Sequence, residues 1–437
     1  MLCGESLAVQ CVAFVIDNCR VFMEIFVAIV IMKTIAIQSP LSARRSPVLV
    51  LLAVTSIASL SSTFRAEALT GAPKNQVIAT VKVGENPDCI VVSPDSKTVY
   101  VANNNGTNGC NSSVSVIDAF DLPRYTVEAT ICISDYALYL ALSPDGNTLY
   151  VSEYPPSLNT DPSANVVEVY DVTNPTNPSF RTRLKVGDDV GGLAASPDGT
   201  KLYVTNGSPV YARKISNDLA APGSIYVFNT TTFKQTNNII CHGSPFQVLF
   251  VDKGAQAEQA DVLNEAGAGF IQFIQVALGK LSNSTGAGGR IFEPSGMVTN
   301  ASGSILCVAD DVNYVAVCNA QDGTVSAIYP AVSSVFDLEF LGQPALTPNG
   351  EYLYVPYGGG GRLGIGYGVQ FNPSTGLPVQ ESNDQVVMLN VSTGQIIGSL
   401  ITVGYNPVWA QVSPDGTTLY VANNSDGTVS VIDITPN

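Results

Sequence analysis

The sequence predicts an all-β fold, a seven-bladed β-propeller whose blades are four-stranded antiparallel sheets. Three observations predict it: a turn-and-strand unit that recurs along the chain, alternation of apolar and polar residues between these units, and a difference in type between the first and last strands. Four clear copies of the unit begin at Ser93, Ser143, Ser196 and Ser413. A drifted copy begins at Thr347, and two weaker ones span Phe246–Asn264 and Val298–Asp310.

Each clear copy opens with a tight turn of the type Ser-Pro-Asp-Gly. Proline presets the backbone at the second turn position, and glycine accepts the positive φ that the last position needs. A short apolar strand precedes the turn, as at Ile90–Val92, and a second strand of the type Leu-Tyr-Val follows it. A third strand alternates with period two, as at 428–433, and a fourth resembles the segment 76–84. Four short strands in a repeat of about 40–55 residues are typical of a propeller blade, and we name them A to D from the centre outwards.

The order of strand types predicts how the ring closes. The first strand, Gln76–Val83, is of the D type, whereas the last strand, Thr428–Ile434, is of the C type. The first strand is therefore expected to complete the seventh blade by pairing with the last, which leaves no open sheet edge at the seam. The seven A strands are expected near Ile90, Leu140, Leu193, Val248, Met297, Leu346 and Ala410.

The repeat resembles the YVTN-repeat family of seven-bladed propellers. The resemblance rests on Leu-Tyr-Val-Thr-Asn at 202–206 and its relatives, and it extends from Gln76 to the C-terminus. This family is similar to the lactonase-type propellers and to the haem-carrying propeller of nitrite reductases. Members of the superfamily bind, scaffold or catalyse on the same frame, so the resemblance implies a fold rather than an activity.

The first 68 residues differ from the rest and are typical of an export signal. Positive residues at Arg44 and Arg45 precede an apolar run, Val48–Leu60, and an A-x-A cleavage site, Ala66–Ala68. An uncleaved membrane anchor is the alternative interpretation. Cleavage predicts a secreted or periplasmic protein with no remaining membrane span. The predicted organisation is an over-called N-terminal extension at 1–31, a secretory signal peptide at 32–68 and the propeller at 69–437.

Charge and composition exclude several classes of function. With 20 Lys and Arg against 36 Asp and Glu, the net charge is −16, which argues against a nucleic-acid partner. The single histidine, His242, excludes a multi-histidine metal site. We predict no bound cofactor, with Ca²⁺ as an open alternative, and a monomeric protein.

Six cysteines follow the predicted signal peptide. An even number in an exported chain permits disulfides, although spacing alone gives no connectivity. Cys307 and Cys318 are expected to face each other across a hairpin, which makes them the best candidate pair. The absence of a C-x-x-C motif leaves zinc and redox chemistry without support.

The long connections between strands are expected on one face of the ring. In a propeller the A–B and C–D connections share one face, and the B–C and D–A connections share the other. The A–B turns are minimal, whereas four B–C segments are long: Asn103–Ser113, Tyr154–Asn165, Gly207–Gly223 and Tyr357–Asp384. Long loops on a rigid scaffold usually carry function, so we predict a binding face there, with tolerated insertions as the alternative.

Several residues near this face are candidates for a site. Four acids in D–A or early A positions would place carboxylates around the channel mouth, where they could bind Ca²⁺ or simply be solvated. These acids are Glu85, Asp88, Asp188 and Asp189, and Tyr405 joins them as a candidate ligand-binding residue. His242, in a D–A connection, could ligate a metal or act as a base, with a structural role as the alternative. Arg362, in a glycine-rich loop, could contact an anionic ligand or simply be solvated. Trp409, in an A strand, is expected to pack between blades.

Three functions remain open at this point. The first is an exported propeller that binds a protein, a polymer or a small ligand on its loop face, which the absence of catalytic motifs favours. The second is a lactonase-like hydrolase, which the resemblance allows and for which His242 and Arg362 are weak catalytic candidates. The third, a haem or quinone carrier, has the least support because histidine is nearly absent. We therefore predict a binding protein rather than an enzyme.

Overall fold

A computed structural model describes residues 72–105, 109–120, 125–154, 165–187, 189–207, 223–241, 243–251, 259–264, 270–275, 280–286, 294–310, 313–331, 340–358 and 384–437. Contacts divide the chain into two units, Met1–Thr70 and Gly71–Asn437, and all described residues belong to the second. The predicted extension and signal peptide lie outside the described residues, so both stay predictions.

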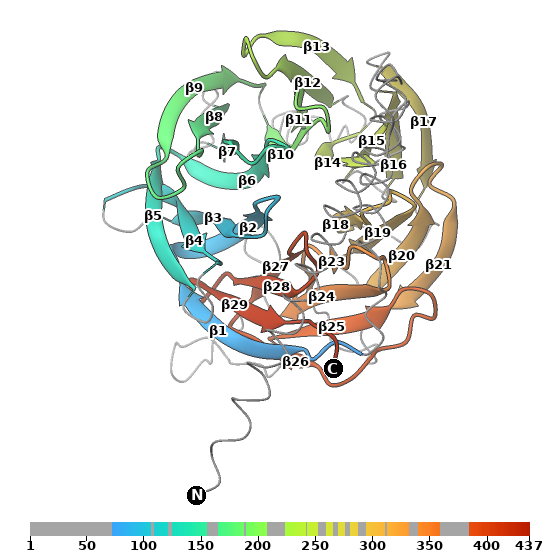
Figure 1. The fold of residues 1–437 in the computed structure, drawn as a ribbon. Helices are drawn as coiled ribbons and strands as arrows, with labels where there is room; N and C mark the ends of the chain where they lie inside the picture. The colour runs from blue at the N-terminus through green and yellow to red at the C-terminus, as the bar shows by residue number, and fades with distance from the viewer. Residues whose placement is uncertain are drawn as a thin grey trace, which may run out of the picture. The chain divides into compact units, whose positions relative to one another are not determined.

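The described residues form seven antiparallel sheets arranged in a ring, which confirms the predicted propeller (Figure 1). The A strands are β2 (Glu85–Val92), β6 (Tyr136–Leu142), β10 (Val190–Ala195), β14 (Pro245–Val251), β18 (Pro294–Thr299), β23 (Ala345–Leu346) and β27 (Pro407–Val412). The B strands are β3 (Thr98–Asn105), β7 (Thr148–Tyr154), β11 (Lys201–Asn206), β15 (Gln259–Asn264), β19 (Ile305–Asp310), β24 (Tyr352–Gly358) and β28 (Thr418–Asn423). The C strands are β4 (Ser112–Asp118), β8 (Val166–Asp171), β12 (Ser224–Asn229), β16 (Phe270–Gln275), β20 (Tyr314–Asn319), β25 (Gln385–Asn390) and β29 (Thr428–Asp433). The D strands are β5 (Thr126–Ile133), β9 (Ser179–Lys185), β13 (Gln235–Ile240), β17 (Lys280–Gly286), β21 (Val325–Pro330), β26 (Ile401–Thr402) and β1 (Gln76–Lys82).

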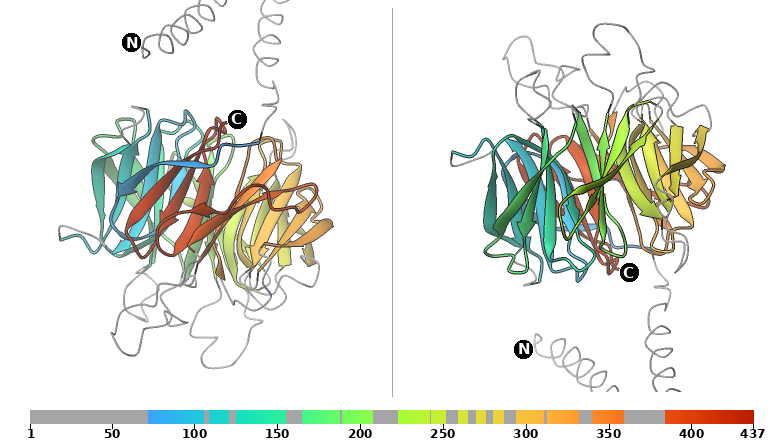
Figure 2. Two further views of the ribbon diagram at one scale, coloured as in Figure 1. Left: turned by 90° about the horizontal axis from the view of Figure 1, so that it is seen from below. Right: turned by 90° about the horizontal axis from the view of Figure 1, so that it is seen from above.

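Every predicted A-strand position falls within an observed A strand. Seen edge-on, the strands of the blades run between the two faces of the ring (Figure 2). Since neighbouring strands in a blade are antiparallel, the ends of the B and D strands lie at one face, together with the starts of the A and C strands.

The ring closes as predicted, between the first and last strands of the fold. The seventh sheet has the order β1-β29-β28-β27, with Gln76 opposite Asp433 and Lys82 opposite Thr428. In Figure 1 the blue β1 lies beside the red β29. Val81 of β1 is 6% exposed and packs into the core next to blade one. Lys74, before β1, pairs with Asp433 at 3.2 Å.

The Ser-Pro-Asp-Gly turns are stabilised by their own side chains. Ser93 Oγ donates to Asp95 Oδ1 (2.6 Å) and accepts from the backbone N–H of Thr98 (2.9 Å). The same pair of hydrogen bonds recurs at Ser143, Ser196 and Ser413. Gly146 has a φ of 73°, and a Cβ there would come within 3.0 Å of Pro94 in the turn of the preceding blade. These turns therefore also pack one blade against the next.

The core lies mainly between blades rather than within them. Six clusters of buried apolar residues each draw on neighbouring blades. The tyrosines of the repeated Tyr-Val motif are almost completely buried there: Tyr100, Tyr150, Tyr203, Tyr354 and Tyr420. Burial raises the pKa of Tyr100 and of Tyr150 to about 12, so these hydroxyls stay protonated at neutral pH. The motif is thus a packing motif of the ring.

Blade six has an interrupted inner strand. The short strand β22 (Phe340–Leu341) pairs with the end of β24, and β23 pairs with its start. Between them Gln343 turns to the next blade, where its N–H donates to Val408 O (2.9 Å) and its carbonyl accepts from Ala410 N–H (3.0 Å). Its side-chain amide also donates to Met297 O of blade five at 2.8 Å.

Trp409, in the strand that Gln343 contacts, lies in the core. Its ring meets that of Tyr139 in blade two edge-on, with centroids 5.9 Å apart. The predicted packing of Trp409 between blades is confirmed.

The predicted pairing of Cys307 with Cys318 is wrong. Cys307 lies opposite Val317 and Cys318 opposite Leu306, so the two side chains are one register step apart and point to opposite faces of the sheet. Cys307 packs toward blade six and Cys318 toward blade four, and both are free thiols. The disulfide among the described residues joins Cys110 to Cys132.

Candidate functional site

The structure describes four of the seven predicted site residues. They are Glu85 and Asp88 in β2, Asp189 before β10, and Tyr405 before β27. Asp188, His242 and Arg362 lie outside the described residues. The lactonase alternative depends on the last two of these, so nothing in the described part of the chain bears on its catalytic groups.

Asp88 lies in a group of side-chain amides at the junction of blades one and seven. Its carboxylate accepts hydrogen bonds from Asn104 Nδ2 of blade one and from Asn424 Nδ2 of blade seven, the latter at 2.5 Å. Asn86 Nδ2 donates to Asn424 Oδ1 (3.1 Å), and Asn105 Nδ2 donates to Asn86 Oδ1 (2.6 Å). We call Asn86, Asp88, Asn104, Asn105 and Asn424 the seam cluster, because they join blade one to blade seven, the blade in which the ring closes.

Tyr405 lies beside the seam cluster. Its backbone N–H donates to Asp426 Oδ2 (2.7 Å), and the next residue, Asn406, accepts from the N–H of Asn424 (2.9 Å). The side chain is partly exposed, at 37%. Asp384 accepts from the N–H of Asn406 (2.9 Å), and burial raises its pKa, opposed by that hydrogen bond and reinforced by Asp426. The structure therefore brings two predicted residues, Asp88 and Tyr405, to one place.

Asp189 lies elsewhere, at the entry to blade three. Its N–H donates to Asn206 Oδ1 (2.9 Å), and its carbonyl accepts from the N–H of Gly207 (2.7 Å). Among the described residues no three His, Cys, Asp or Glu side chains are close enough to hold a metal ion. Asp188 is outside that set, so the Ca²⁺ site stays a prediction.

Blade two departs from the repeat at a buried position. In blades one and seven the residue after Tyr-Val-Ala is asparagine, and its amide donates to a serine hydroxyl of the C strand: Asn103 to Ser115 at 3.1 Å, and Asn423 to Ser430 at 2.9 Å. The equivalent positions of blade two hold Glu153 and Glu168, which are 0% and 2% exposed. Two carboxyl groups thus replace a neutral amide and hydroxyl, a costly exchange in a buried site.

Glu168 accepts hydrogen bonds from two neighbouring side chains. Arg183 lies directly opposite it on β9 and donates to Oε1 from Nε (2.7 Å) and from Nη2. Tyr170 Oη donates to the other oxygen at 2.5 Å. Burial and this hydrogen bond raise the pKa of Tyr170 far above its ordinary value, so the phenol remains a donor. Glu168 and Arg183 therefore form an ion pair in which the carboxylate is buried and half of the Arg183 side chain is exposed to solvent.

Glu153 is a buried carboxyl group with a raised pKa. Burial, followed by the neighbouring Glu168, raises its pKa to about 9. Neither of its oxygens receives a hydrogen bond from another described group. Glu153 is thus a buried carboxyl group beside the ion pair of Glu168 and Arg183.

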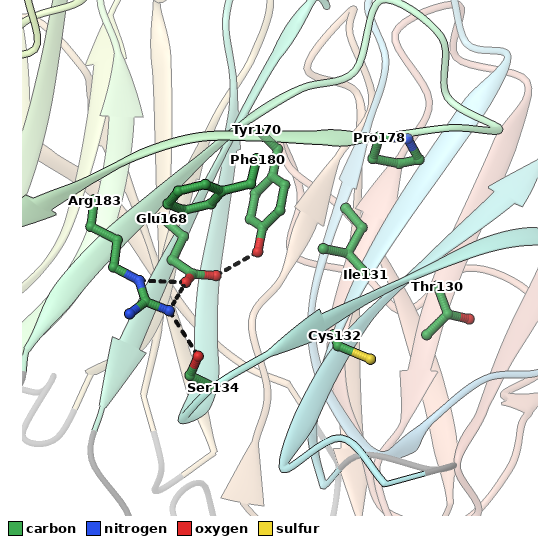
Figure 3. Close-up of a pocket in the computed structure, with 9 residues that line it drawn as sticks. All are labelled: Thr130, Ile131, Cys132, Ser134, Glu168, Tyr170, Pro178, Phe180 and Arg183. Atoms are coloured by element: carbon green, nitrogen blue, oxygen red, sulfur yellow. Dashed lines mark hydrogen bonds and ion pairs between the residues drawn. The ribbon is translucent and has the colours of Figure 1, made fainter.

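A pocket of about 570 Å³ opens beside Glu168, between blades one and two. In Figure 3 Glu168, the Tyr170 hydroxyl and Ser134 lie on one side of the space, and Ile131 and Cys132 lie on the other. The strands that line it, β5, β8 and β9, are the outer strands of their blades, so the pocket lies toward the rim.

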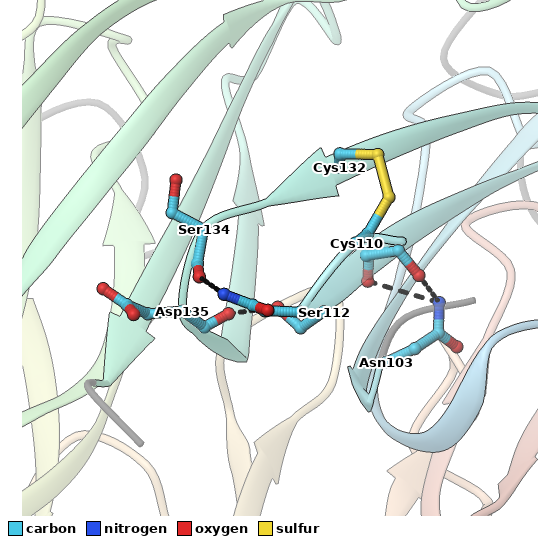
Figure 4. Close-up of a disulfide and its surroundings, with 8 residues drawn as sticks. Asn103, Cys110, Ser112, Cys132, Ser134 and Asp135 are labelled. Atoms are coloured by element: carbon cyan, nitrogen blue, oxygen red, sulfur yellow. Dashed lines mark hydrogen bonds between the residues drawn. A yellow bond between two sulfur atoms is a disulfide. The ribbon is translucent and has the colours of Figure 1, made fainter. Parts of the chain in front are cut away.

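The disulfide shapes one wall of this pocket. Cys110, just before β4, is bonded to Cys132 at the end of β5 (Figure 4). Beside it, Asn111 Nδ2 donates to Ser134 O (2.6 Å) and Ser112 Oγ donates to Asp135 O. The turn so fixed places Ser134 Oγ 2.8 Å from Arg183 Nη2 of blade two.

Removal of this disulfide is expected to destabilise the propeller. The bond closes a loop of 22 residues, for which the chain-entropy model gives about 3 kcal/mol. We expect the double variant Cys110→Ser/Cys132→Ser to lose about that free energy of unfolding, measured by equilibrium denaturation in urea. Peptide mapping of the unreduced chain should find Cys307 and Cys318 alkylated after unfolding. A peptide that joins those two would contradict the observed connectivity.

Sequence reasoning missed the pair of glutamates. The signal was present in the repeat itself, since the copy that begins at Ser143 ends in Ser-Glu where three others end in asparagine. Comparison of the copies position by position could have found Glu153, because the other three clear copies have asparagine at that position.

Comparisons with known proteins bear on the fold only. No family model and no curated protein matches the chain. A solved structure of Kuenenia stuttgartiensis hydrazine synthase is similar, with a TM-score of 0.59 and 20% identity over 85% of this chain and 99% of that one. None of the described segments is a helix long and apolar enough to cross a bilayer.

Proposed function

We propose that the chain is an exported propeller that binds a ligand on the face formed by its B–C and D–A connections. The observation that supports this most is the seam cluster, in which four side-chain amides and one carboxylate converge beside the partly exposed Tyr405. The disulfide supports export, because such bonds persist in oxidising compartments.

The chemistry of the seam cluster favours a neutral polysaccharide as the ligand. Side-chain amides both donate and accept hydrogen bonds, as vicinal hydroxyl groups do. A tyrosine ring can cover the apolar face of a sugar while its hydroxyl stays hydrated. The net charge of −16 disfavours polyanionic polymers.

Binding to an array of neutral glycans tests the proposal. We expect residues 69–437 to bind at least one neutral glycan and not heparin, and Asn424→Ala with Tyr405→Ala to weaken that binding at least tenfold, about 1.4 kcal/mol. Asn238→Ala, an exposed amide on β13, serves as the control and should leave it unchanged. Equal binding by the seam variant would refute the assignment of the face.

The same preparation tests the enzymatic alternative. If the chain hydrolyses a γ-lactone and His242→Ala abolishes that activity, a function of binding alone is wrong. If the chain does not hydrolyse the γ-lactone, the result supports the binding proposal over the lactonase alternative.

A further inference from the structure

We propose that the disulfide between Cys110 and Cys132 is a redox site, which a small thiol with an apolar body opens at Cys132 while the propeller stays folded. Cys132 lines the pocket between blades one and two, and no residue of the seam cluster lines it. The inference therefore does not depend on the function proposed above.

The first support is the different access to the two cysteines. Cys132 is exposed and lines the pocket, whereas Cys110 is only partly exposed and is not among the lining residues. The described cysteines outside this bond are buried free thiols. In thiol–disulfide exchange a thiolate attacks one sulfur atom of the bond, and access decides which sulfur that is. We therefore expect the attack at Cys132 Sγ.

The second support is the apolar surface in the same pocket. The Phe180 ring, 54% exposed, lies on the blade-two side of the space, and Ile131 and Cys132 lie on the blade-one side (Figure 3). Contact of an apolar group with an exposed ring removes apolar surface from water, which is favourable. The guanidinium of Arg183 is already bound to Glu168, so the pocket offers no unpaired charge to a charged thiol. An uncharged thiol with an apolar body fits this lining best.

The third support is that the two cysteines stay close when the bond is open. β4 and β5 pair from end to end, and Asn111 Nδ2 donates to Ser134 O (2.6 Å) beside the disulfide (Figure 4). None of these hydrogen bonds needs the S–S bond. A loss of about 3 kcal/mol from a stability of about 5–15 kcal/mol leaves the domain folded. The two thiols of the reduced chain are therefore placed to bond again.

The exchange transfers two electrons in two steps. The thiolate of the small thiol attacks Cys132 Sγ, a mixed disulfide forms, and Cys110 leaves as a thiolate that takes a proton from water. A second molecule of the small thiol attacks its own kind in the mixed disulfide and releases Cys132 as a thiol. The small thiol is thereby oxidised to its disulfide, and the protein disulfide is reduced. In the reverse direction, Cys110 attacks Cys132 Sγ of the mixed disulfide and displaces the small thiol.

Reduction of the folded chain by benzyl mercaptan and by 2-mercaptoethanol tests the site. Each rate constant is divided by that of the same thiol with oxidised glutathione, which corrects for the reactivity of the thiol itself. We expect a rate that rises in proportion to the thiol concentration while Trp409 fluorescence keeps its folded value. The corrected rate should be about tenfold higher for benzyl mercaptan. Acid quenching and peptide mapping should find the mixed disulfide on Cys132.

Two variants test the part that the pocket plays. Phe180→Ala should abolish most of the difference between the two thiols, because it removes the exposed ring from the pocket. Phe120→Ala is the matched control, since Phe120 is 69% exposed and is not among the lining residues, and it should leave the difference unchanged.

Four results would each overturn the inference. They are a rate that does not depend on thiol concentration, which means that reduction waits for unfolding, a mixed disulfide on Cys110, equal corrected rates for the two thiols, and a difference that persists in Phe180→Ala. The concentration dependence and the peptide map need only the wild-type chain, so they decide even if a variant fails to fold.

Discussion

A chain that begins at Glu85 is expected to lose at least about 4 kcal/mol of its free energy of unfolding relative to one that begins at Leu69. The shorter chain lacks β1, which exposes the edge of β29 and removes Val81 and Val83 from the core. Each buried valine contributes about 2 kcal/mol. Because a folded domain is stable by only about 5–15 kcal/mol, much of that margin should disappear. Trp409, the single tryptophan, lies in blade seven and reports the urea transition by its fluorescence.

Point variants of β1 distinguish closure of the ring from mere loss of chain length. Val81→Ala, at a buried position, should cost about 2 kcal/mol. Val77→Ala, at a position 37% exposed on the same strand, should cost less than about 0.5 kcal/mol. An unchanged urea midpoint in the shortened chain would show that the ring does not depend on its seam.

Arg183→Gln is expected to destabilise the propeller by about 3 kcal/mol at neutral pH. The change leaves Glu168 buried without its positive partner, and an uncompensated buried charge is one of the costliest defects in a fold. Arg181→Gln is the matched control on the same strand. Arg181 pairs with Asp171 in an exposed ion pair, so its loss should cost less than about 1 kcal/mol. Equal costs for the two variants would contradict the buried pair.

Glu153→Gln is expected to remove a pH dependence of the free energy of unfolding. The pKa of Glu153 lies near 9 in the folded chain against an ordinary value of 4.5, so between these values the folded state binds a proton that the unfolded state has lost. Stability therefore falls as the pH rises through this range. Urea denaturation at pH 6 and pH 8 should show that the wild-type chain loses more stability across this range than Glu153→Gln does.

Much of the fold could be predicted because its causes are local. The Ser-Pro-Asp-Gly turns are held by hydrogen bonds within five residues, as between Ser93 and Thr98. Each copy of the motif therefore predicts a hairpin from its own sequence. The place of Trp409 in the core followed from the same strand count. Even the closure of the ring was predictable, since it needs only the order of strand types along the chain.

The connectivity of the disulfide could not be predicted from local sequence, because it depends on the register between strands. A shift of one residue between β19 and β20 turns Cys307 and Cys318 to opposite faces of the sheet. Both faces are buried against neighbouring blades, so hydrophobic alternation does not distinguish the two registers. Cys110, in the β3–β4 connection, meets Cys132 near the end of β5 because β4 and β5 pair there.

The sequence by itself determined the type, number and circular order of the blades, because turn chemistry and a period of two act within each repeat. Only the tertiary structure decided which side chains from different strands and blades share a place: Asp88 with Asn424 across the seam, and Glu153 with Glu168 and Arg183 in blade two. The physical reason is that charge, burial and hydrogen bonding depend on distances in space. Those distances follow from register and from the packing of neighbouring blades, which no single repeat contains.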